Sequence, residues 1–166
     1  MDLGRLSNGE RISSISAILL FISMFFHWFG AKTVNTSSLL IAFQGFEPEK
    51  NAWQALDYIP FVLLVTISVT LVVAALRTIP EAQLPVSVNG LTAILGCASA
   101  LLIIFRIVDP PIFYAEGTFT IEGTVQFPMF LALPAAVGIT TGGLLALREE
   151  GVSFAGLRAR RGERGR

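Results

Sequence analysis

The sequence has few charged residues, one cysteine and one histidine, and each scarcity excludes a class of protein. Charged residues make up 14% of the 166 positions, against about 25% in a soluble domain. Cys97 alone forms no intrachain disulfide and cannot provide the cysteine pair of a thiol-oxidising membrane enzyme. His27 alone excludes haem and metal sites that need several histidines.

The usual catalytic patterns are also missing. The chain has no glycine-rich phosphate-binding loop, and a serine nucleophile with a partnered base cannot be assembled around the single His27. We therefore predict no catalytic, cofactor-binding or metal site, and a protein that is not an enzyme. His27 is expected to be an interface residue.

Long apolar runs dominate what is present. Hydrophobic residues are 53% of the chain, and a helix of about 20 apolar residues covers the roughly 30 Å core of a bilayer. The pattern predicts an all-α membrane protein: a four-transmembrane-helix antiparallel bundle over residues 1–147, followed by a polar tail. The predicted spans are residues 12–29, 57–76, 86–107 and 127–147, with outside loops 30–56 and 108–126 and a basic cytoplasmic tail, 148–166.

The second span has two alternative beginnings. Asp57 is a good N-cap residue, and Pro60 is tolerated in the first turn of a helix. Alternatively, the helix begins at Asn51 and kinks at Pro60, which leaves Asp57 as a carboxylate at the membrane boundary. We favour the cap, because capping is the commoner use of aspartate at such a position.

The outside loops are expected to form a small β-hairpin/loop cap. Residues 118–127 alternate between apolar and polar, and Glu122-Gly123 provides a turn. An isolated hairpin is only marginally stable, so we expect it to pack on the first loop, with residues 39–43 as a candidate strand. Trp28 is expected in an aromatic belt at the same interface.

The basic residues determine the predicted orientation. Nine of the twelve lie on the side of the two termini, and only Lys32, Lys50 and Arg106 lie on the other. The positive-inside rule therefore places both termini in the cytoplasm of a multi-pass protein of the cell (plasma) membrane.

Small residues mark candidate helix contacts. Gly138 and Gly142 form a GxxxG pair, and Gly96 and Ala100 have the same spacing. Such spacing lets two helices approach closely. It serves packing inside one bundle or association of two copies, and we favour the first.

One cluster of charges is predicted at the outer boundary. Antiparallel threading places Asp57 and Arg106 at the same height, with Asp109 three residues after Arg106. An ion pair among them is one interpretation. The other is that Arg106 extends to the interface or has a purely structural role.

The tail carries a basic cluster next to the membrane: Arg158, Arg160, Arg161 and Arg164. Such a cluster attracts anionic lipids, and it also fixes the orientation of the chain. We expect no nucleic-acid binding.

Four segments give the chain a family resemblance: GERISSISAILLFISMFFHWFG, NAWQALDYI, RIVDPP and REEG. In these it resembles small four-span integral membrane proteins of high-GC Gram-positive bacteria, a bacterial family with no assigned activity. The resemblance implies a fold and a compartment only.

The expected function is therefore that of a structural or interaction subunit in the lipid bilayer, bound to another membrane protein or to a second copy of itself. The alternative is a component of a transporter or channel for a small solute, ion or lipid. A polar cavity at mid-membrane would favour this alternative, since coupled carriers usually hold a charged residue there.

Overall fold

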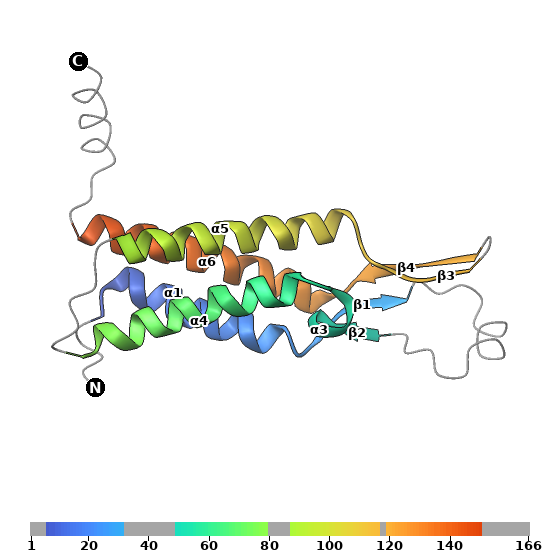
Figure 1. Cartoon of the computed structure of the whole chain (residues 1–166), viewed down its shortest axis with the longest axis horizontal. Coiled ribbons are helices and arrows are strands. Elements are labelled where there is room, and N and C mark those ends of the chain that lie inside the picture. Colours follow the sequence, from blue (N-terminus) through green and yellow to red (C-terminus); the bar gives the residue numbers. More distant parts are fainter. Residues whose placement is uncertain (1–5, 32–48, 80–86, 117–118, 151–166) are drawn as a thin grey trace, which may run out of the picture.

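The computed structural model describes residues 6–31, 49–79, 87–116 and 119–150. Four long helices run along the longest axis of the molecule (Figure 1). They are α1 (Asn8–Ser23), α4 (Ile59–Arg77), α5 (Ser87–Val108) and α6 (Phe127–Glu149). At one end lie the one-turn helix α3 (Ala52–Ala55) and four short strands, β1 (His27–Ala31), β2 (Glu49–Asn51), β3 (Ile112–Glu116) and β4 (Phe119–Val125).

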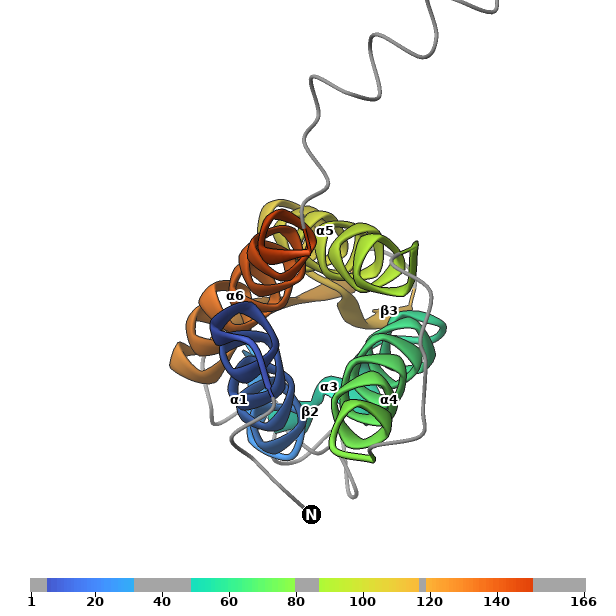
Figure 2. The same ribbon diagram turned by 90° about the vertical axis from the view of Figure 1, so that its left-hand side faces the viewer.

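The four long helices form an antiparallel bundle. Seen end-on, they are arranged in the order α1, α6, α5, α4 (Figure 2), and each packs on its two neighbours in that order. Three of them are long and apolar enough to cross a membrane: α4, residues 88–108 of α5, and α6. Helix α1 has 16 residues and is shorter than these three.

The end of α1 corrects the predicted span 12–29. The helix ends at Ser23, and His27–Ala31 is a strand. Trp28 stabilises this change of direction, because its indole Nε1 donates a 2.7 Å hydrogen bond to the carbonyl of Ser23 at the end of the helix. The side chain of Trp28 is fully buried, so it is a core residue and not the belt residue that we predicted.

The beginning of α4 corrects the predicted cap. Its N-cap is Tyr58, with no side-chain cap hydrogen bond, and Pro60 lies in the first turn. Asp57 precedes the cap. The helix does not extend back to Asn51 either, because Leu56 is extended and separates α3 from α4. Leu56 is 2% exposed, and its burial fixes the corner between the two helices.

The strands form one four-stranded sheet in the order β2-β1-β4-β3. All its pairs are antiparallel; in the central pair Phe29 lies opposite Val125. The predicted turn at Glu122-Gly123 is wrong, because both residues lie inside β4 and the pairing of Glu116 with Phe119 places the reversal earlier. The candidate strand at residues 39–43 lies outside the described residues.

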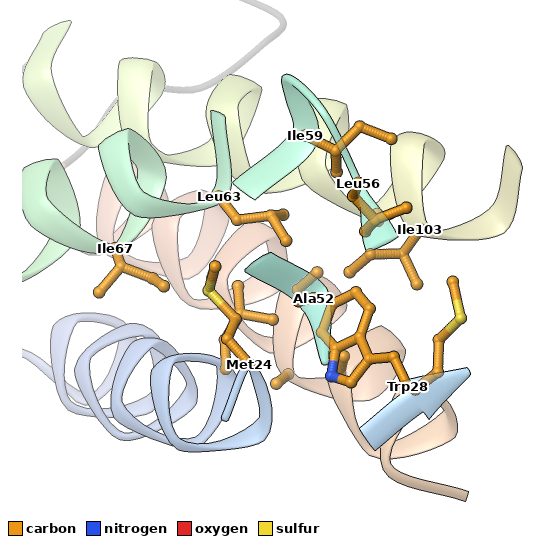
Figure 3. Packing of buried hydrophobic residues seen from close by; sticks show 14 of the residues in the cluster. Met24, Trp28, Ala52, Leu56, Ile59, Leu63, Ile67 and Ile103 are labelled. Atoms are coloured by element: carbon orange, nitrogen blue, oxygen red, sulfur yellow. The ribbon is translucent and has the colours of Figure 1, made fainter. Parts of the chain in front are cut away.

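The hydrophobic core lies where the bundle meets the sheet. Its members come from α1, β1, α3, α4, α5 and α6, and Figure 3 shows part of this cluster. The labelled members are Met24, Trp28, Ala52, Leu56, Ile59, Leu63, Ile67 and Ile103. Tight packing of this kind holds the sheet at a fixed position on the end of the bundle.

Small residues mediate the contacts of α6. A Cβ built on Gly142 would lie 2.6 Å from the carbonyl oxygen of Gly9 in α1. Gly138 of α6 faces Ser16 of α1, and Gly96 of α5 faces the backbone of Thr140 of α6. Ala100 is part of the core. In the described chain, the predicted small-residue positions therefore face other helices of the same molecule.

Candidate functional site

A pocket opens at the sheet end of the bundle, between the α3–α4 corner and the end of α5. Its volume is about 410 Å³. We call it the outer pocket; it is lined by Lys50, Gln54, Ala55, Asp57, Arg106, Asp109, Pro110, Pro111 and Ile112. All three residues of the predicted outer charge cluster line it.

The local fold explains how these residues meet. Asn51 caps α3 by accepting a hydrogen bond from the amide of Gln54 at 3.0 Å. Asp57 follows this short helix and lines the pocket. Arg106 lies in the last turn of α5. The amide of Asp109 donates to the carbonyl of Phe105 at 2.8 Å, which continues the helical ladder and places Asp109 beside Arg106.

Arg106 lines the pocket without a carboxylate in direct contact. Within the described ranges, no ion pair joins it to Asp57 or Asp109. Its Nε is buried and has no hydrogen-bond partner there. Its guanidinium carbon lies 5.7 Å from the centroid of the Phe105 ring, which is within the range of a cation–π contact.

The pocket is balanced in charge. Lys50 and Arg106 contribute two positive charges, and Asp57 and Asp109 two negative ones. Both aspartates are exposed. A site of this composition is suited to a polar group that carries charges of both signs, because each charge of the ligand then finds an opposite charge.

A second charged cluster lies at the opposite end of the bundle, and sequence reasoning missed it. The Nε of Arg77 in α4 lies 3.2 Å from Oε1 of Glu10 in α1, and its NH2 group contacts Glu150 after α6. Glu10 is 5% exposed. The sequence could have predicted this cluster, because antiparallel threading places the start of the first span beside the ends of the second and fourth spans.

Among the described residues, no charged side chain is buried in the bundle interior between these clusters, and the polar groups there are mainly hydroxyls. Thr66 of α4 and Ser99 of α5 lie 2.9 Å apart, oxygen to oxygen. Thr70 and Thr92 bond back to carbonyls of their own helices. Self-contained bonding of this kind satisfies the hydroxyls without water.

The remaining candidate residues have peripheral positions. His27 lies 3.4 Å from Glu49, Nδ1 to Oε2, and both side chains are more than half exposed. Cys97 is exposed on α5. No group of three or more histidine, cysteine or acidic residues is placed to hold a metal in the part of the chain that the structure describes. The tail residues Arg158, Arg160, Arg161 and Arg164 lie outside that part.

Comparisons of the chain with protein-family models, with curated proteins and with solved structures find no match.

Proposed function

We propose that the chain is a multi-pass protein of the cell membrane with four spans and both termini in the cytoplasm. We further propose that it acts as a structural or interaction subunit and not as an enzyme. The observation that carries the proposal is an apolar belt that covers the outward faces of all four long helices. Its exposed members include Ile15, Ile18, Leu19, Ile22, Phe61, Val65, Val72, Leu91, Ile94, Leu101, Ile104, Phe130, Leu131, Val137 and Leu144.

Such a belt is incompatible with water. Soluble monomers rarely expose contiguous apolar patches of more than a few hundred square ångströms, whereas lipid tails solvate them. The charged contacts of the described residues lie at the two ends of the bundle, around Arg77 at one end and Arg106 at the other. This distribution supports burial of the middle of the bundle in a bilayer.

Helix α1 supports the fourth span by its position. It lies along α6, with the amide of Gly9 3.5 Å from Oε2 of Glu149. The start of α1 is therefore level with the end of a candidate span. Sixteen residues give a helix of only about 24 Å, and the exposed Phe25 and Phe26 extend the apolar surface beyond its end.

Labelling of single cysteines tests this topology. In a Cys97→Ser background, cysteines replace the exposed residues Asn8, Thr124 and Glu149. We expect a membrane-impermeant maleimide to label T124C in intact cells, and N8C and E149C only after permeabilisation. Labelling of N8C but not E149C in intact cells would overturn the fourth span, and labelling of both, without T124C, would overturn the orientation.

The role as a subunit is supported by the bundle interior, in which the described residues offer no charged path across the membrane, and by the sheet, which lies beyond one end of the four long helices (Figure 1). Gentle extraction from native membranes, followed by sizing and mass spectrometry, tests it. We expect a stoichiometric partner protein or a second copy of the chain to co-elute. A monomer without a partner would contradict this role.

The alternative, a component of a transporter or channel, is favoured by one feature. Asn89 of α5 is 2% exposed, and its Nδ2 has no hydrogen-bond partner among the described residues. Thr92, one turn further into the bundle, is also buried. Solute flux into liposomes that contain the protein, abolished by Asn89→Leu and retained by the exposed Thr141→Val, would support transport. Absence of flux would contradict the transport alternative and would favour the role as a subunit.

A further inference from the structure

We propose that the outer pocket binds a zwitterionic group in which a phosphate is linked to an ammonium by a short chain, as in ethanolamine phosphate. This goes beyond the function proposed above, which concerns threading and protein partners. The group has two possible sources: the headgroup of a phospholipid in the outer leaflet, or a free molecule with the same chemistry.

Arg106 is the anchor for the anionic half of the ligand. Its Nε is buried and has no partner among the described residues. A buried donor without an acceptor is costly, and the guanidinium fork matches the oxygens of a phosphate. Lys50 adds a second positive charge to the same pocket.

Asp57 and Asp109 form the part of the site that would bind the cationic half of the ligand. They lie on two different elements, the α3–α4 corner and the end of α5, and both line the pocket. Neither forms an ion pair with Arg106 in the described ranges, so neither carboxylate is neutralised by it. A ligand ammonium that lies between them would be stabilised by both charges.

The shape of the pocket favours a small, polar ligand. A volume of about 410 Å³ is at the lower end of the range of about 300–1,000 Å³ that is typical of ligand pockets. Pro110 and Pro111 form one wall, and their fixed φ angles make this wall stiff. The carbonyl of Pro111 accepts a hydrogen bond from the amide of Gly123 at 3.0 Å, which ties the wall to β4.

The position of the pocket admits both sources. Arg106 and the exposed Phe105 and Val108 lie in the last turn of α5, where the apolar belt meets the charged end. A lipid headgroup reaches this level from the bilayer, and a soluble molecule reaches it from the water outside.

The first arm of the test uses the full chain in detergent and measures binding of glycerophosphoethanolamine. Glycerol phosphate, which is only anionic, and ethanolamine, which is only cationic, are the half-ligands for comparison. We expect the zwitterion to bind at least tenfold more tightly than either half. Equal binding of glycerol phosphate would overturn the zwitterionic site and leave a simple anion site.

The second arm uses the full chain in nanodiscs that contain equal amounts of phosphatidylethanolamine and phosphatidylglycerol. Mass spectrometry then counts the lipids that remain bound. Selective retention of phosphatidylethanolamine identifies a lipid headgroup, and binding of the soluble compound alone identifies a free ligand. Absence of both would overturn the proposal, whatever the outcome of the topology experiment, because the detergent arm does not depend on orientation.

Substitutions of pocket residues test whether the soluble zwitterion or the lipid headgroup binds in the outer pocket. Arg106→Gln and Asp109→Asn should each weaken binding of the zwitterion at least tenfold. Asp109→Asn is nearly isosteric at an exposed position, so it remains informative if Arg106→Gln does not fold. Glu49→Gln, at an exposed residue outside the pocket, is the matched control. Unchanged binding by Asp109→Asn would refute the role of the carboxylates.

Discussion

Thr66 Oγ1 and Ser99 Oγ lie 2.9 Å apart in the interior of the bundle, where both side chains are completely buried. Thr66 also lies 2.9 Å from the carbonyl of Val62. If Thr66 donates to that carbonyl, Ser99 is the donor between the two hydroxyls, and both protons have acceptors. Thr66 Oγ1 also lies 3.5 Å from the carbonyl of Leu95 in α5, and these contacts fix the register of α4 and α5.

A double-mutant cycle measures its contribution. Hydrogen bonds between membrane helices contribute about 0.6 kcal/mol on average, with a maximum of about 1.7. We expect Thr66→Val and Ser99→Ala each to lower the free energy of unfolding by about 0.5–1.5 kcal/mol. The double variant should lose less than the sum, and strict additivity would show that the hydroxyls are not coupled. Thr141→Val, at an exposed hydroxyl that bonds only within α6, is the control.

Gly142→Ala should destabilise the protein strongly. The new Cβ would lie 2.6 Å from both the carbonyl oxygen of Gly9 and the amide of Ser13. Backbone atoms cannot move aside without separating α1 from α6, and overpacking typically costs about 1–3 kcal/mol. Thermal unfolding in detergent, monitored by circular dichroism, measures the loss.

Gly90→Ala is the matched control for that prediction. A Cβ at Gly90 would meet only Leu147 Cδ1 at 3.8 Å, an ordinary contact, and alanine favours the helix by about 0.5–1 kcal/mol over glycine. We expect the melting temperature to be unchanged or raised. Equal losses in the two variants would argue against close packing as the cause.

Arg77→Met should destabilise the end of the bundle opposite the sheet. It leaves Glu10, which is 5% exposed, without its charge partner. Removal of one member of a buried pair costs about 3–5 kcal/mol. The side chain of Arg77 is 23% exposed, so we expect a smaller loss of about 2 kcal/mol in denaturant unfolding.

The reciprocal variant separates charge from packing. Glu10→Gln in the Arg77→Met background should recover part of the stability, because it removes the unpaired buried charge. If the double variant is as unstable as the sum of the two single variants, Arg77 acts through its aliphatic stem and not through its charge.

Trp28→Phe should loosen the junction between the bundle and the sheet. It removes the 2.7 Å bond to the carbonyl of Ser23 and leaves space in a fully buried site. The Ser23 carbonyl still accepts from the amide of Phe26 at 3.2 Å, so we expect a loss of about 2 kcal/mol from the cavity and the lost indole hydrogen bond.

Tryptophan fluorescence checks the same site independently. The chain has two tryptophans, Trp28 and Trp53, and Trp53 is 36% exposed. Trp53→Phe should leave a blue-shifted emission from Trp28 alone, and Trp28→Phe a red-shifted one. Similar emission from both variants would place Trp28 outside the core.

Much of the bundle was predictable because local composition determines it. The spans predicted at 57–76, 86–107 and 127–147 correspond to helices that begin and end within three residues of these bounds. Apolar length is a property of the chain itself, and in lipid it permits little besides a helix. The meeting of Asp57, Arg106 and Asp109 at one pocket also follows from antiparallel threading.

The errors share a physical cause. The run Phe25–Phe29 is apolar enough to continue a helix, yet Trp28 gains more from the core and from the carbonyl of Ser23 than from lipid. Glu122-Gly123 is a good turn pair, yet it lies within β4 because the chain reverses earlier. In both cases long-range packing outweighed a local preference.

The sequence by itself determined the apolar lengths and the separation of charge to the ends of the spans. Only the tertiary structure decided that α1 ends at Ser23, that Arg77 meets Glu10 and Glu150, and that Arg106 faces a pocket without a bonded carboxylate. Helix formation depends on neighbours along the chain. These contacts depend on residues far apart in sequence, which only the packed bundle brings together.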